Sequence, residues 1–351
     1  MIRRGASVLF ALILCSACAG NGRAAASPTS VVAPSATPLI DVNDMMGAFP
    51  PATFYVLDKD GLKAIALLNH ATRYTIPVGK DAQAAAASAA GRVYVLDQIA
   101  EGARIRWFDL DSATERASRV ITGASVVSTG IGHGALAIDD TTGMGYALIR
   151  ENGGIVTESF DWFTLKSAGS VFGVMTCPSR VLAGGGRVAA ACMKEGLVVV
   201  RDGTSTYKPG APFAFAAVAM LGDGTVVVGA EDGRIGRFAR NATSGFDYSD
   251  ALKNYGAKLI PDGIAVNAGC CLYYGVIDPT IPDVQVRSIA GGTMLLVFPD
   301  FAQPVGGIFV QAPFAYFVIG GRARHVEINQ GFGEVMVDLG PSAVPGAVAN
   351  H

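Results

Sequence analysis

Charged residues are scarce in this chain, and histidine and tryptophan are scarcer still. Only 16% of the 351 residues are charged, half are hydrophobic, and the formal net charge is −2. Disordered chains combine higher charge with lower hydrophobicity, and nucleic-acid-binding proteins carry a basic surface. After the first 20 residues, no stretch of the sequence reaches the roughly 18 uninterrupted apolar residues that a transmembrane helix needs. We therefore expect a folded, exported chain with no nucleic-acid partner.

The N-terminal residues predict export. Arg3 and Arg4 precede an apolar segment at residues 7–14, and small residues follow it. This is the order of a secretory signal peptide, and the apolar segment is too short to be a stable bilayer span. We assign residues 1–17 to this signal.

Cys18 is the candidate lipidation site. Small residues precede it, as in the bacterial lipobox, although Cys15 stands where that pattern usually has leucine. Ordinary cleavage after Ala19 is the alternative. Residues 18–44 are rich in Ala, Ser and Pro without an apolar period, which predicts a flexible tether. We expect a lipoprotein anchored in the cell envelope, in the outer membrane or at the cell surface, because Ala19 gives no acidic retention signal.

One unit recurs along the rest of the chain. It has a short strand of small or apolar residues, a turn with Gly, Pro or Asp, and a strand of aromatic and β-branched residues. The second strands recur at a mean spacing of about 43 residues, which matches a four-stranded propeller blade. We predict an all-β, seven-bladed β-propeller of four-stranded antiparallel blades at residues 45–345, with a tail at 346–351. The anchors of the repeat are Tyr55, Tyr94, Tyr146, Val188, Val226, Leu272 and Ala315.

Three details follow from the repeat. The alanine run at 84–90 favours a helix by propensity, but we predict an innermost strand, because residues 216–219 and 263–266 fill the same slot with small residues. We expect residues 334–339 to pair with the first unit and close the ring. A longer loop at 122–134 accounts for the wide spacing between the second and third anchors.

Two segments carry a family resemblance: FYVLDKDGLKAIALLNHATRYTIPVG at 54–79 and VYVLDQIAEGARIRWFDLDSATERASRVITG at 93–123. They resemble the seven-bladed propellers of the YVTN and WD-repeat-like class, in which a Tyr-Val strand precedes a strand ending in Asp. The match covers about two blades well and the others in outline, and the Gly-His and Trp-Asp signature of the WD subclass is absent. The resemblance implies a fold, and little about activity, because propellers host enzymes and scaffolds alike.

The remaining cysteines suggest a disulfide. A hairpin centred on Gly185 places Cys177 opposite residue 193, so a bond between Cys177 and Cys192 is geometrically possible in an oxidising compartment. Two buried thiols are the alternative. Cys270 and Cys271 are neighbours at the matching turn of the sixth unit, where a vicinal disulfide is possible but rare. We predict no metal site there, because no Cys-x-x-Cys or histidine lies nearby.

In a four-stranded blade, the loops between second and third strands lie on the same face of the propeller as the connections between blades. We expect functional residues on that face. The sequence has no His-Glu-x-x-His, Gly-x-Ser-x-Gly or phosphate-loop pattern. Closely spaced aspartates near residues 58–61 and 109–115 suit calcium, but they also suit turns in which Asp accepts backbone N–H groups. The weak catalytic candidates on the expected face, the last of them in a loop, are Asp58, Glu101, Glu231, Asp278 and His325.

Three functions remain. The first is an envelope-anchored, monomeric propeller that binds a protein partner as a scaffold, without catalysis or cofactor, since the predicted loops carry charges of both signs. The alternative is a lactonase-like hydrolase or lyase with a divalent metal or an acid/His site at the channel mouth. A quinone-dependent dehydrogenase is disfavoured, because such propellers usually repeat a tryptophan motif and this chain has only Trp107 and Trp162.

Overall fold

The described chain consists of strands joined by turns. The computed structural model describes residues 53–58, 61–66, 71–78, 82–88, 90–110, 112–127, 134–241, 245–249, 257–267, 271–277, 284–288, 294–298, 305–311, 314–319, 322–327 and 337–341. Within these ranges the strands form seven antiparallel sheets, which we number in chain order. The predictions for Cys18, Cys270, Asp278 and the two terminal segments lie outside the described residues.

The first three sheets lie in the N-terminal half. Sheet 1 contains β1 (Thr53–Asp58), β2 (Gly61–Ala66) and β3 (Thr72–Ile76). Sheet 2 contains β4 (Ala82–Ser88), β5 (Arg92–Ile99), β6 (Gly102–Asp109) and β7 (Thr114–Thr122). Sheet 3 contains β8 (Ser125–Val126), β9 (Leu136–Asp139), β10 (Met144–Glu151), β11 (Gly154–Asp161) and β12 (Ser167–Ser170).

The other four sheets have four described strands each. Sheet 4 contains β13 (Arg180–Gly184), β14 (Arg187–Cys192), β15 (Leu197–Asp202) and β16 (Ser205–Tyr207). Sheet 5 contains β17 (Ala217–Met220), β18 (Val226–Gly229), β19 (Ile235–Asn241) and β20 (Gly245–Ser249). Sheet 6 contains β21 (Lys258–Asn267), β22 (Cys271–Ile277), β23 (Val284–Ser288) and β24 (Met294–Phe298). Sheet 7 contains β25 (Val305–Gln311), β26 (Phe314–Ile319), β27 (Arg322–Glu327) and β28 (Val337–Pro341).

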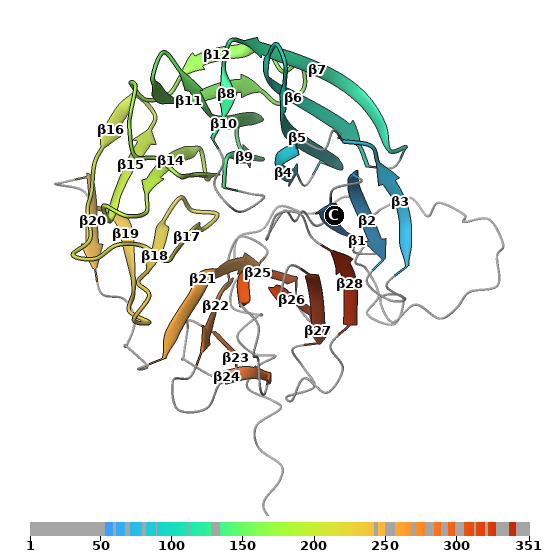
Figure 1. The fold of residues 1–351 in the computed structure, drawn as a ribbon. Coiled ribbons are helices and arrows are strands. Elements are labelled where there is room, and N and C mark those ends of the chain that lie inside the picture. Colours follow the sequence, from blue (N-terminus) through green and yellow to red (C-terminus); the bar gives the residue numbers. More distant parts are fainter. Residues whose placement is uncertain are drawn as a thin grey trace, which may run out of the picture.

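The sheets stand around a common centre (Figure 1). Consecutive strands pair in order within the sheets, except that β8 and β9 of sheet 3 both pair with β10. Strands such as β4, β9, β17 and β21 face the centre, while β7, β12, β16 and β20 lie outside. All seven anchors of the repeat fall in strands, namely β1, β5, β10, β14, β18, β22 and β26. The all-β prediction with four-stranded antiparallel sheets is therefore confirmed.

The alanine run forms the inner strand β4, as predicted. Ala84 and Ala85 are fully buried, and β4 contacts both β1 and β9. The run forms a strand although alanine favours a helix, because a strand lets the small side chains pack against two neighbouring inner strands. The next strand along, β5, is buried continuously from Val93 to Asp97, which is the pattern of a strand covered on both faces.

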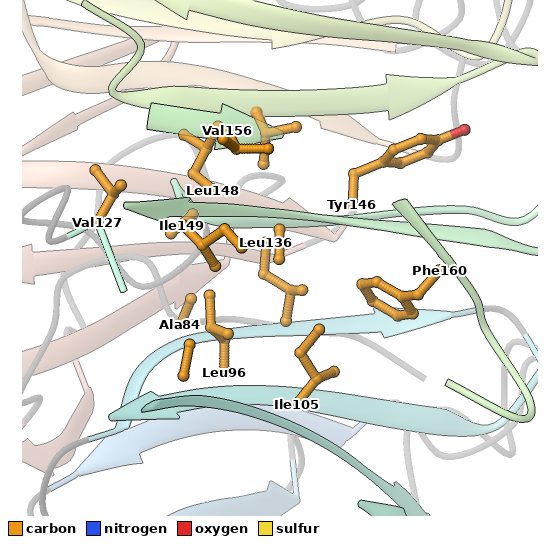
Figure 2. Packing of buried hydrophobic residues seen from close by; sticks show 14 of the residues in the cluster. Ala84, Leu96, Ile105, Val127, Leu136, Tyr146, Leu148, Ile149, Val156 and Phe160 are labelled. Atoms are coloured by element: carbon orange, nitrogen blue, oxygen red, sulfur yellow. The ribbon is translucent and has the colours of Figure 1, made fainter. Parts of the chain in front are cut away.

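The core lies between adjacent sheets. Between sheets 2 and 3, Leu96 and Ile105 pack towards Leu136 and Phe160 (Figure 2). The contact is close enough to need a glycine, since a Cβ on Gly145 of β10 would lie 2.2 Å from ring carbons of Phe160. Each large side chain buried in this way contributes about 1.5–3 kcal/mol, so the sheets depend on their neighbours for stability.

Two local predictions were wrong, and one was half right. Residues 337–339 do not pair with the first sheet: they belong to β28, which pairs with β27. His325 is not in a loop but within β27, opposite Tyr316 of β26. The loop expected at 122–134 contains the short strand β8, which pairs with β10, while residues 128–133 lie outside the described part.

Candidate functional site

The predicted site residues do not form one cluster in the described part of the chain. Glu101 lies in the turn between β5 and β6, and Glu231 lies in the turn after β18, so they belong to sheets 2 and 5. Both are exposed, and Glu231 is 3.4 Å from the Nζ of Lys258. Asp58 ends β1, so its backbone lies at the expected face. Glu101 and Glu231 therefore stand on sheets that are not consecutive, and neither belongs to a group of three metal-binding side chains within the described ranges.

The buried carboxylates all have donors. Asp97 is 1% exposed and accepts hydrogen bonds from both Arg104, at 2.7 and 3.0 Å, and Arg106, at 2.6 Å. Asp139 accepts the backbone N–H of Gly186 from the next sheet, and Glu158 accepts from Arg119 of the previous one. Each of these carboxylates is held as an acceptor between strands or sheets, which suits a structural role more than proton transfer.

The fourth buried carboxylate spans two sheets. Asp262 Oδ1 and Oδ2 accept hydrogen bonds at 3.2 and 3.0 Å from Nε and Nη2 of Arg180, which begins the inner strand of sheet 4. Asp262 lies in an irregularity of β21 between Leu259 and Ile264, with φ of +52°. Aspartate tolerates this left-handed region better than most residues. The strand irregularity thus directs a carboxylate past sheet 5 to an arginine.

A disulfide lies next to this arginine. Cys177, in the segment before β13, is bonded to Cys192 at the end of β14. A carboxylate oxygen of Glu195 lies within 4.8 Å of both sulfur atoms. This is the one group of metal-binding side chains within the described ranges, but its sulfur atoms are bonded to each other and are not thiolates.

Both tryptophans of the chain lie near Arg92, on the face opposite to the one where the sequence placed the site. This face carries the turns between first and second strands and between third and fourth strands. The guanidinium of Arg92, at the start of β5, lies 5.2 Å from the ring centroid of Trp107, 4.9 Å from that of Trp162 and 5.1 Å from that of Phe163. We call these four residues the Arg92 cluster. Its rings come from β6 of sheet 2 and from the β11–β12 turn of sheet 3.

Hydrogen bonds fix the two sheets against each other at the Arg92 cluster. Trp107 Nε1 donates to the carbonyl of Phe163 at 2.8 Å, and the Tyr94 hydroxyl donates to the carbonyl of Trp162 at 2.8 Å. Burial raises the pKa of the Tyr94 phenol to about 12, so it stays a donor at physiological pH. Asp161 Oδ1 accepts the backbone N–H groups of Phe163 and Thr164. The Thr164 N–H, with the Thr164 hydroxyl, lowers the pKa of this carboxyl below its ordinary value.

Phe163 is the exposed member of the Arg92 cluster. Its side chain is 56% exposed, whereas Trp107 is 6% exposed, and the two rings are 5.7 Å apart. Large exposed apolar side chains are few in the described part, the others being Val120 and Val174. Sequence reasoning missed this cluster because Arg92 and Phe163 are 71 positions apart. The signal that was available is that both tryptophans fall next to turns on the same face of neighbouring units.

Several solved structures resemble the overall fold of this chain. No protein-family model and no curated protein matches the chain. The β-propeller domain of Cps50 (Swd1) from Myceliophteria thermophila matches with a TM-score of 0.52 and 13% identity, over 82% of this chain and 91% of that one. The fold is a β-propeller.

Two further structures agree with the propeller fold. The dihydro-heme d1 dehydrogenase NirN, solved in complex with DHE, has a TM-score of 0.56 and 11% identity, over 85% of this chain and 66% of NirN. A protein of unknown function from Desulfotomaculum acetoxidans has a TM-score of 0.58 and 12% identity, over 85% and 98% of the two chains. At these identities the likeness shows the fold alone and assigns no activity to this chain. No helix in the described ranges is long and apolar enough to cross a bilayer.

Proposed function

We propose that this chain is a seven-bladed propeller, exported and anchored to the cell envelope through a lipid on Cys18, that binds a protein partner without catalysing a reaction. Its seven described sheets correspond to the blades, and residues 18–44 serve as the tether. Two features of the described part support a binding role. The buried carboxylates have donors, and Glu101 and Glu231 are exposed on sheets that are not neighbours.

The observation that carries the proposal is the Arg92 cluster. Tryptophan, arginine and other aromatic residues are enriched at protein interfaces and dominate their binding energy. Here Trp107 and Arg92 contact an exposed phenylalanine at the junction of two blades, and Arg92 also lies over the Trp162 ring. Propeller domains such as that of Cps50 show the same fold, and we infer a scaffold role for this chain from its own surface.

Cys18→Ser tests the anchor. In the native host, the wild-type chain should incorporate a palmitate analogue and sediment with membranes, and Cys18→Ser should lose both properties. Ser30→Ala is the control, because it changes a residue of the predicted tether and leaves Cys18 and the residues before it unchanged. If Cys18→Ser still incorporates the label, or if the wild type never does, the lipoprotein assignment is wrong.

Reversible crosslinking in intact cells tests partner binding. Wild-type protein should yield a discrete adduct with another envelope protein, at a yield that saturates as its expression rises. A chain that yields no adduct, or only a continuous smear of products, contradicts the scaffold role.

A further inference from the structure

We propose that Phe163 is the anchor of the docking surface and that it inserts into an uncharged, apolar pocket of the partner protein. The inference rests on the proposed scaffold function and specifies the chemistry of its partner. It concerns the face that carries the first-to-second and third-to-fourth strand turns, opposite to the face on which the sequence placed the site.

The ring of Phe163 is exposed yet held in place. On one side it meets the Trp107 ring and the Arg92 guanidinium, at centroid distances of 5.7 and 5.1 Å. Its backbone carbonyl accepts from Trp107 Nε1, and its N–H donates to Asp161 Oδ1. A side chain fixed before binding loses little conformational entropy on docking, so more of its burial contributes to affinity.

The charges around the ring compensate one another. Arg92 is enclosed by three rings, and its positive charge acts on Asp161 nearby. Asp109, at the end of β6, lies 3.9 Å from the Nη2 of Arg116. Among the described residues of the adjoining turns, the remaining exposed charges are Asp140 and Lys166, which are of opposite sign.

An acidic or basic partner surface would therefore gain little electrostatic binding energy at this face. An apolar partner surface would bury the open side of the Phe163 ring. Opposite charges that already neutralise one another give no long-range attraction to a charged surface. Burying an exposed aromatic ring in an apolar pocket is favourable irrespective of salt. The local charge balance thus selects an uncharged pocket as the complement of Phe163.

Photo-crosslinking from position 163 tests the proposal directly. A benzophenone amino acid replaces Phe163 in the full-length chain, produced in its native host, and this keeps an aromatic ring at the site. The control carries the same amino acid in place of Val174, which is 67% exposed and lies outside the Arg92 cluster. We expect a discrete adduct from position 163 at a yield at least about tenfold above that from position 174, as a hot-spot residue implies.

Two further arms separate the possible outcomes. Isolated envelopes crosslinked at about 50 mM and about 500 mM salt should give adduct yields within about twofold of each other, because an apolar contact is not screened. Phe163→Ala, with Val174→Ala as the control, should reduce co-purification of the adduct partner about tenfold. Strong loss at high salt, or an adduct from position 174 only, overturns the apolar-pocket proposal and leaves the scaffold function standing. Absence of any adduct from both positions overturns both.

Discussion

Arg180 and Asp262 form a buried ion pair between inner strands that are not neighbours in the fold. Arg180 begins β13 of sheet 4, and Asp262 lies in the irregular part of β21 in sheet 6, with their side chains 3.0 and 3.2 Å apart at two hydrogen bonds. The backbone N–H of Asp262 also donates to the carbonyl of Ala216, just before β17 of sheet 5. One residue therefore connects three successive sheets near the centre of the propeller.

Asp262→Asn should destabilise the chain strongly. Asparagine keeps the left-handed backbone favourable but leaves the Arg180 charge buried and without its carboxylate, which costs about 3–5 kcal/mol. Urea unfolding of the wild type and of this variant measures the difference. Asp232→Asn is the control, because Asp232 pairs with Arg234 at the surface, where such pairs are worth about 0–1 kcal/mol. Equal losses for the two variants would contradict the structural role assigned to Asp262.

Reduction of the Cys177–Cys192 disulfide should lower stability. The bond closes a segment of 15 residues, for which loop-closure entropy predicts about 3 kcal/mol. Thermal unfolding of wild-type protein with and without a thiol reductant, beside the Cys177→Ser/Cys192→Ser double variant, measures this. The double variant should match the reduced wild type and should no longer respond to reductant. A reductant effect that persists in the double variant would place the responsible bond elsewhere.

Gly145→Ala should destabilise the junction between sheets 2 and 3. The new Cβ would lie 2.2 Å from the Phe160 ring, so the ring or the strand must shift, at a cost of about 1–3 kcal/mol. Gly173→Ala is the control, because a Cβ there meets nothing within 4 Å and Gly173, like Gly145, does not have a left-handed φ. Adding Phe160→Leu to Gly145→Ala removes the aromatic ring. If the double variant recovers none of the stability that Gly145→Ala loses, the Phe160 ring is not the obstacle.

Tyr94 should make stability fall at high pH. Its pKa is raised from 10.0 to about 12 in the folded chain, first by burial. The unfolded chain therefore releases this proton at a lower pH than the folded one, and the free energy of unfolding decreases as the pH rises from about 10 to about 12. Denaturant unfolding across that range measures the slope. Tyr94→Phe should make the fall of the unfolding free energy with pH shallower. An unchanged slope in this variant would show that other groups cause the fall.

The repeat was predictable because strand pattern is a local property. Each anchor strand combines aromatic or β-branched residues with a turn next to it, and this pattern recurs at a period that only a few folds share. The alanine run needed the other repeats as context, since its own propensity favours a helix. His325 was misplaced because the charged residues at 322–325 resemble a loop, whereas the register places them in β27.

The Arg92 cluster and the Arg180–Asp262 pair were not predictable in the same way. Both join side chains from different sheets, and a single sequence fixes which strands exist far better than which side chains meet between them. The left-handed Asp262 also depends on an irregularity in β21, which Asp262-Gly263 signals only as a turn. Contacts between blades come from packing over the whole fold, and these are the contacts on which the candidate site depends.

The most direct test of the scaffold role is quantitative recovery of envelope partners on the anchored, full-length chain. Wild type, Phe163→Ala and Val174→Ala would be isolated in parallel from crosslinked cells, after equal thermal stability has been confirmed. We expect one partner to be recovered with the wild type and with Val174→Ala, and its yield to fall about tenfold with Phe163→Ala. Equal recovery with all three chains would contradict a partner-binding site at the Arg92 cluster.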